Sequence, residues 1–119
     1  MTTSYPVRLK VGLREDFRLI WQSSDDLTEC EVTFLIKARG QAGFAAFNNI
    51  SPVSDFIHVD GSDPGPWTVT VSIPWDDFLL VVGTDASGGS SYGRWSLNIT
   101  DTALVERQVL SGTWFRDEG

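Results

Sequence analysis

The stretch YGRWSLNITDTALVERQVLSGTWF, from Tyr92 to Phe115, carries the strongest fold signal in the chain. In its first part Trp95, Leu97 and Ile99 alternate with polar residues, and this period of two is typical of a half-buried β-strand. A polar break at positions 101–102 is short enough to be a turn, and a second alternating run follows it. The stretch therefore predicts a terminal antiparallel hairpin, and we expect all earlier strands to form the sheet that faces it.

The alternation in the second strand of this hairpin predicts which of its side chains share a face. Strict alternation assigns two faces, with Val105, Arg107, Val109, Ser111 and Thr113 on one and Leu104, Glu106, Gln108, Leu110, Gly112 and Trp114 on the other. Three other tryptophans, Trp21, Trp67 and Trp95, alternate in step with aliphatic neighbours and are predicted to be core. Trp75 and Trp114 are the candidates for exposed rings, because an exposed indole stacks on sugars or anchors a protein partner.

The rest of the chain shows the same period-two pattern in shorter pieces. Alternation predicts strands at 5–13, 17–22, 30–38, 53–59 and 67–73, with a short strand near 44–47. Pro74 begins an amphipathic stretch with acidic residues in its first turn, which predicts a short helical turn at 74–82 that covers one end of the fold. The glycine- and serine-rich segment 83–91, which includes Gly88 and Gly89, predicts a flexible loop.

These elements predict an all-β fold, a single antiparallel immunoglobulin-like β-sandwich of about seven to eight strands with one short helical turn. The domain is expected to span residues 1–119, with 117–119 as a frayed tail. Such a length buries enough surface to fold without disulfides or metals.

Composition narrows the range of partners. The chain has 16 acidic and 9 basic side chains, and its formal net charge of −7 opposes binding to nucleic acid and to anionic membranes. No signal peptide is visible, and no apolar run is long enough to span a bilayer, so we expect synthesis in a cytoplasm.

Catalytic and metal-binding chemistry is poorly represented. The single histidine, His58, lies in a strand-like run, and the single cysteine, Cys30, is predicted to be a small buried side chain. The carboxylate pairs at 25–26 and 76–77 are better explained by a turn and a helix N-terminus than by catalysis. Asp60, Asp63 and Asp85 lack the spacing of a known calcium loop. We predict no catalytic residue, no metal and no cofactor, and therefore no enzyme.

The terminal hairpin also carries a family resemblance. The segments WSLNITD, at 95–101, and VLSGT, at 109–113, resemble the last hairpin of small immunoglobulin-like domains in tailed-bacteriophage baseplate, tail and fibre-adaptor proteins. The first strand at 9–13, the charged Arg14-Glu15-Asp16 with Phe17 after it, and the Asp26-Leu27-Thr28 turn are similar to that family as well.

The resemblance implies a structural virion protein in the phage tail or baseplate, with many copies in a symmetric assembly and other phage structural proteins as partners. We expect contacts through strand edges and aromatic residues. Two alternatives stay open, a carbohydrate-binding module that stacks sugars on Trp75 or Trp114, and a capsid decoration protein. The candidate contact residues are Trp75, Trp114, Gly88, Gly89, Tyr92 and Tyr5.

Overall fold

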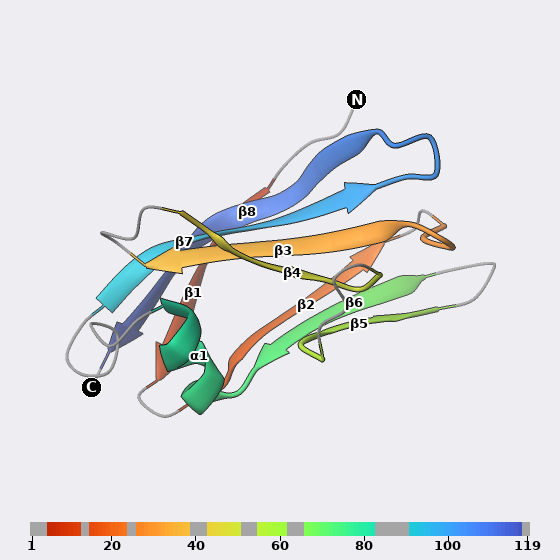
Figure 1. Ribbon diagram of the computed structural model, residues 1–119. Coiled ribbons are helices and arrows are strands. Elements are labelled where there is room, and N and C mark those ends of the chain that lie inside the picture. The colour runs from red at the N-terminus through yellow and green to blue at the C-terminus, as the bar shows by residue number, and fades with distance from the viewer. Residues whose placement is uncertain are drawn as a thin grey trace.

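The chain folds as two facing β-sheets with one helix at one end (Figure 1). The computed structural model describes residues 5–12, 15–23, 26–38, 43–50, 55–61, 66–82 and 91–117. The elements within them are β1 Tyr5–Gly12, β2 Phe17–Ser23, β3 Glu31–Ala38, β4 Ala45–Asn48, β5 Ile57–Asp60, β6 Trp67–Ile73, α1 Trp75–Val82, β7 Ser91–Thr100 and β8 Glu106–Asp117. The prediction of an all-β sandwich with one short helix is confirmed.

The terminal hairpin β7–β8 lies in the middle of the larger sheet, which has the order β1-β8-β7-β3-β4. The expectation that all earlier strands form the facing sheet was therefore wrong, because only β2, β6 and β5 do so. The pairing is also not antiparallel throughout, since β1 runs parallel to β8, with Tyr5 opposite Leu110. A period of two shows that a strand has one buried face, but it does not identify the neighbouring strand or its direction.

Some boundaries also differ from the prediction. Strand β5 begins at Ile57, after a turn at 55–56, and positions 53–54 lie outside the described residues. Strand β8 extends to Asp117, the first residue of the predicted frayed tail, while 118–119 lie outside the described residues.

The core between the sheets is built around linked aromatic rings. Phe17 of β2 packs on Phe34 of β3 with ring centroids 5.5 Å apart, and Phe34 packs on Trp95 of β7 at 6.1 Å. Phe78 of α1 stacks on Phe17 at 5.8 Å and meets Trp114 of β8 edge-on at 4.9 Å. All five rings are fully buried or nearly so, and they join both sheets and the helix in one cluster.

A β-bulge in β8 overturns the predicted faces of that strand. Leu97 of β7 pairs with Leu110, but the next residue, Asn98, pairs with Gln108, so Val109 is one extra residue in β8. Val109 and Leu110 are consequently both buried, and the inward face changes phase between them. This is why Trp114, predicted as an exposed candidate, is fully buried. Two adjacent apolar residues in an alternating strand were the only sequence signal of the bulge.

Each tryptophan of the hairpin lies opposite a glycine on the neighbouring strand. Trp95 pairs with Gly112, and Trp114 pairs with Gly93. The Trp114 ring passes over Gly93, and its Nε1–H donates a hydrogen bond of 3.0 Å to the Lys37 carbonyl oxygen of β3. The Trp95 Nε1–H donates one of 3.1 Å to the Thr113 carbonyl oxygen. The two glycines leave room for indole rings whose polar atoms are satisfied by backbone.

Helix α1 covers the end of the sandwich, as predicted. The backbone N–H of Trp75 donates to the Asp16 carboxylate at 3.1 Å, so the β1–β2 connection caps the helix. The Phe78 N–H donates to the Pro74 carbonyl oxygen at 2.7 Å, which closes the first turn. These bonds place Phe78 in the aromatic cluster.

The close contact at Gly93 gives a first prediction. A Cβ at this position would lie 1.9 Å from the Lys37 carbonyl oxygen and 2.6 Å from Trp114 Nε1. Gly93→Ala therefore pushes both β3 and the Trp114 indole away from position 93. We expect it to lower the free energy of unfolding by about 1–3 kcal/mol, measured by urea denaturation followed by tryptophan fluorescence.

The matched control is Gly43→Ala, since a Cβ at this exposed glycine meets no atom within 4 Å. It should change stability by less than about 0.5 kcal/mol. Equal stability of the two variants would show that the packing of Trp114 does not depend on the space above Gly93.

Candidate interaction surfaces

The turn of the β7–β8 hairpin is tied together by one aspartate. Asp101 Oδ1 accepts hydrogen bonds from the backbone N–H of Ala103 at 2.9 Å and of Val105 at 3.0 Å. The Leu104 N–H also donates to the Asp101 carbonyl oxygen, and the Asp101 N–H donates to that of Val105. Four hydrogen bonds therefore fix the turn at 101–105, which we call the hairpin tip.

Leu104 in this hairpin tip combines two unusual properties. Its φ is 63°, in the left-handed region that favours glycine or asparagine, and its side chain is 84% exposed. Val105 beside it is 58% exposed. Strict alternation assigns both residues to the second strand of the hairpin, but β8 begins only at Glu106. The turn thus presents two apolar side chains to solvent on a fixed backbone.

The backbone strain at Leu104 can be measured separately from the loss of its side chain. Leu104→Gly and Leu104→Ala both remove the isopropyl group beyond the Cβ, but only alanine keeps a Cβ at positive φ. We expect the glycine variant to be more stable by about 1 kcal/mol in urea denaturation.

At the neighbouring Ala103, whose φ is not positive, the preference should reverse, and Ala103→Gly should lower stability by roughly 0.5–1 kcal/mol. An alanine at position 104 as stable as a glycine would contradict the strain.

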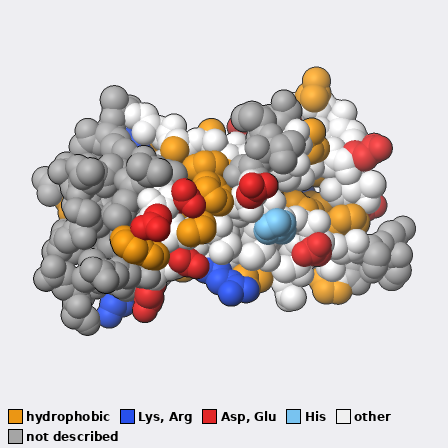
Figure 2. Space-filling view, turned by 60° about the horizontal axis from the view of Figure 1, so that its bottom comes forward, with side chains coloured by type: hydrophobic (Ala, Val, Ile, Leu, Met, Phe, Trp, Pro, Cys, Tyr) orange, Lys and Arg blue, Asp and Glu red, His pale blue; other side chains and the backbone are white. Residues whose placement is uncertain are grey.

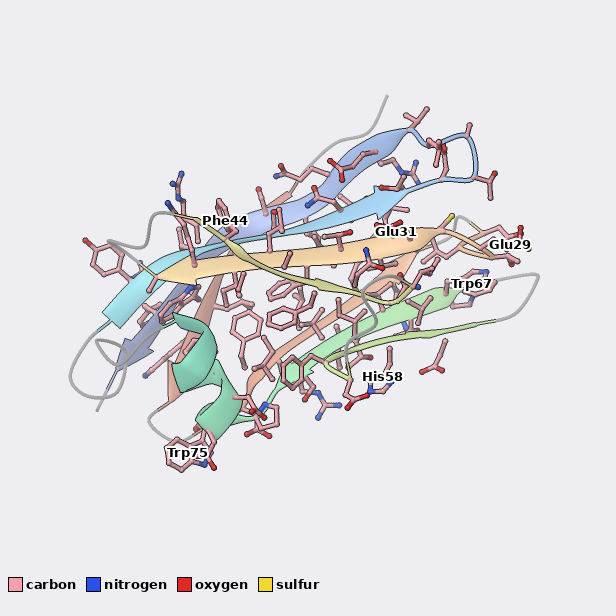
Figure 3. The ribbon with its side chains drawn as sticks, in the orientation of Figure 1. Glu29, Glu31, Phe44, His58, Trp67 and Trp75 are labelled. Carbon is pink, nitrogen blue, oxygen red and sulfur yellow. The ribbon has the colours of Figure 1, made fainter. Side chains whose placement is uncertain are left out.

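The predicted contact residues do not form one site. Trp114 is buried, whereas Trp75 at the start of α1 is half-buried and points away from the sandwich (Figure 3). Tyr92 of β7 is 51% exposed. Tyr5 belongs to β1, but its side chain lies outside the described residues, as do Gly88 and Gly89.

Aromatic and basic side chains meet on the outer face of the five-stranded sheet. The Arg8 guanidinium of β1 lies over the Phe115 ring of β8, 4.4 Å from its centroid. On the same face, towards the β4 edge of the sheet, Lys37 Nζ lies 5.3 Å from the centroid of the exposed Phe44 ring. Tyr92 pairs with Phe115 across the strands. No sequence pattern reveals this grouping, because its members are distant along the chain.

The histidine and the carboxylates form no metal-binding cluster among the described residues. His58 is exposed on the outer face of β5, and Figure 2 shows it among scattered acidic side chains. The Thr28 hydroxyl, and then the Thr28 backbone N–H at 2.8 Å, lower the pKa of the Asp26 carboxyl below its ordinary value, so this residue has the predicted turn role. Asp63 and Asp85 lie outside the described residues, within which no three metal-ligating side chains come together.

Cys30 is buried directly before β3, and its thiol donates to the Asp26 carbonyl oxygen at 3.9 Å. Burial raises the pKa of the thiol above its ordinary value, and the Asp101 carboxylate raises it further, while Arg107 acts in the opposite direction. A raised thiol pKa means less thiolate at any given pH, and the thiolate is the reactive form.

We therefore expect Cys30 to react with a thiol reagent at least about ten times more slowly in the folded protein at about pH 8 than in urea. Absorbance of the released chromophore measures both rates. Equal rates would show that this thiol is accessible and ionised in the fold.

No protein-family model matches the chain, and no curated protein matches its sequence. In the part of the chain that the structure describes, no helix has the length and apolar character to cross a bilayer.

Proposed function

We propose that the chain is a non-enzymatic structural protein of a tailed-phage virion, a baseplate, tail or fibre-adaptor subunit that acts through protein–protein contacts. The observation that carries the contact role is the hairpin tip, where Leu104 is exposed in a strained conformation. The virion role comes from the resemblance to phage domains of the terminal hairpin, the first strand with the charged residues and Phe17 after it, and the turn at 26–28.

The energetics of the hairpin tip favour a binding role. A left-handed leucine costs roughly 1–3 kcal/mol relative to a relaxed residue, with no gain from burial in the isolated chain. Burying its side chain in a partner returns about 1.5–3 kcal/mol. The hydrogen bonds to Asp101 hold the backbone of the tip before the partner arrives, which lowers the entropy cost of docking. Leu104 and Val105 therefore fit an apolar pocket on a neighbouring subunit.

The motif that carries the resemblance has a physical basis in the fold. Its Gly112 faces Trp95, and its last part leads into the buried Trp114. The VLSGT segment is thus a packing motif of the hairpin.

The carbohydrate-binding alternative has little support in the geometry. One of its two stacking rings, Trp114, lies in the core with its Nε1–H bonded to the Lys37 carbonyl oxygen. The remaining ring, Trp75, is half-buried at the start of α1, so the two predicted stacking rings do not form one binding platform.

The experiment that tests the virion role is mass spectrometry of tails and capsids dissected from purified phage particles. We expect the chain in tails, at a copy number that is a multiple of the tail symmetry. Presence in capsids alone would instead make it a decoration protein, and absence from particles would overturn the proposal.

The role of the hairpin tip is tested with Leu104→Ser in the same particles. We expect this variant to fold but to be incorporated at a lower level. The control is Ile20→Ser, which changes an equally apolar, 53% exposed side chain on the outer face of β2 and should be incorporated normally. Equal incorporation of the two variants would remove the hairpin tip from the assembly contact.

A further inference from the structure

The outer face of the five-stranded sheet is positively charged at one end. The register places one outward-facing residue from each of four adjacent strands in a row, namely Lys37 of β3, Arg94 of β7, Thr113 of β8 and Arg8 of β1. The next outward row contains Tyr92, Phe115 and Lys10. Neither row contains an acidic residue, although acidic residues outnumber basic ones in the chain. We call these two rows the basic end.

The other end of the same face is acidic. Glu31 of β3, Thr100 of β7 and Glu106 of β8 form one outward row by their register. Asp101 and Glu29 are exposed just beyond it. Figure 3 shows Glu29 and Glu31 at the end of the molecule opposite to Phe44, which marks the basic end. We call this row and its two neighbours the acidic end.

Between the two ends the face is uncharged and composed mostly of small side chains. One row contains Leu35, Ser96 and Ser111, and the next contains Thr33, Asn98 and Gln108. Asn98 Nδ2 donates to Ser96 Oγ at 3.3 Å, which holds the amide along the sheet. A surface of this kind lets a second sheet approach to about 10 Å, the usual separation of packed sheets.

We propose that this face binds the same face of a second copy of the chain, with the strands reversed. A two-fold axis in the plane between the sheets, running across the strands between Ser96 and Asn98, places each basic end over the acidic end of the partner copy. Arg94 and Thr100 are six residues apart on β7, about 20 Å, so Arg94 then lies above the row of Glu31 and Glu106. The same contact occurs twice, which makes the surface self-complementary.

Charge decides between this partner and others. The parallel alternative, with like ends together, places Lys37, Arg94 and Arg8 against their own copies and is repulsive. An unrelated acidic partner would match the basic end but would meet Glu31 and Glu106 at the other end. Only a partner with the reversed pattern satisfies both ends, and the chain itself carries that pattern. The inference does not depend on the virion role.

The test is sedimentation velocity of the whole chain from about 1 to about 500 µM, because a small polar interface gives a weak dimer. We expect a monomer–dimer equilibrium in roughly 50 mM salt that weakens at least about ten-fold in roughly 500 mM salt. A chain that stays monomeric at every concentration in low salt would overturn the proposal.

Two charge reversals test the orientation. Arg94→Glu and Glu106→Arg each place like charges face to face at both contacts, so each variant alone should dimerise at least about ten-fold more weakly. Mixing the two variants should restore the dimer. In the mixed pair the two introduced side chains, of opposite charge, face each other at one contact, and the unchanged Arg94 and Glu106 face each other at the second. Both positions are exposed, so the folded core is untouched, and tryptophan fluorescence checks this.

The matched control is Arg18→Glu, which makes the same charge change at an exposed position of β2 in the other sheet. It should leave the dimer intact. If Arg18→Glu weakens the dimer as much as Arg94→Glu does, or if the mixed variants stay monomeric, the copies do not pair through this face in this orientation, and the proposal is overturned.

Discussion

The structure depends on the way Trp114 is accommodated across three strands. Its ring lies over Gly93 of β7, its Nε1–H reaches the Lys37 carbonyl oxygen of β3, and its edge meets Phe78 of the helix. One side chain from β8 therefore sets the spacing of three neighbouring strands and the position of α1. A buried indole is favourable only if its N–H is bonded, so the glycine and the carbonyl are both required.

This arrangement separates the stabilising part of the molecule from the parts that can bind. The aromatic cluster runs through the interior and joins the two sheets, while the charged rows and the hairpin tip lie on the surface and at one end. Exposed residues such as Arg94, Glu106 and Leu104 can therefore change with little effect on the core. In such a fold the binding surfaces can diverge faster than the packing motif of the hairpin.

The sequence predicted individual elements well and their neighbours poorly. Alternation located the buried faces of β2 and β3, because each of these strands has one core face along its whole length. It failed in β8, where one extra residue at the bulge shifts the phase and buries Trp114. It also failed to pair β1 with β8.

For the candidate surfaces the same limit applies. Composition described the chain as acidic, yet register brings Lys37, Arg94 and Arg8 into one basic row, and the positive φ of Leu104 arises from the hydrogen bonds that Asp101 makes around the turn.

The parallel pairing of β1 with β8 has a consequence for how the chain folds during synthesis. Tyr5 leaves the ribosome 105 positions before its partner Leu110 (110 − 5). Strand β1 therefore has no partner until β8 has been synthesised, and its apolar face stays open to other nascent chains or chaperones during that interval. Closure of the larger sheet is a late step with a large loop to close, so this small domain should fold slowly for its size.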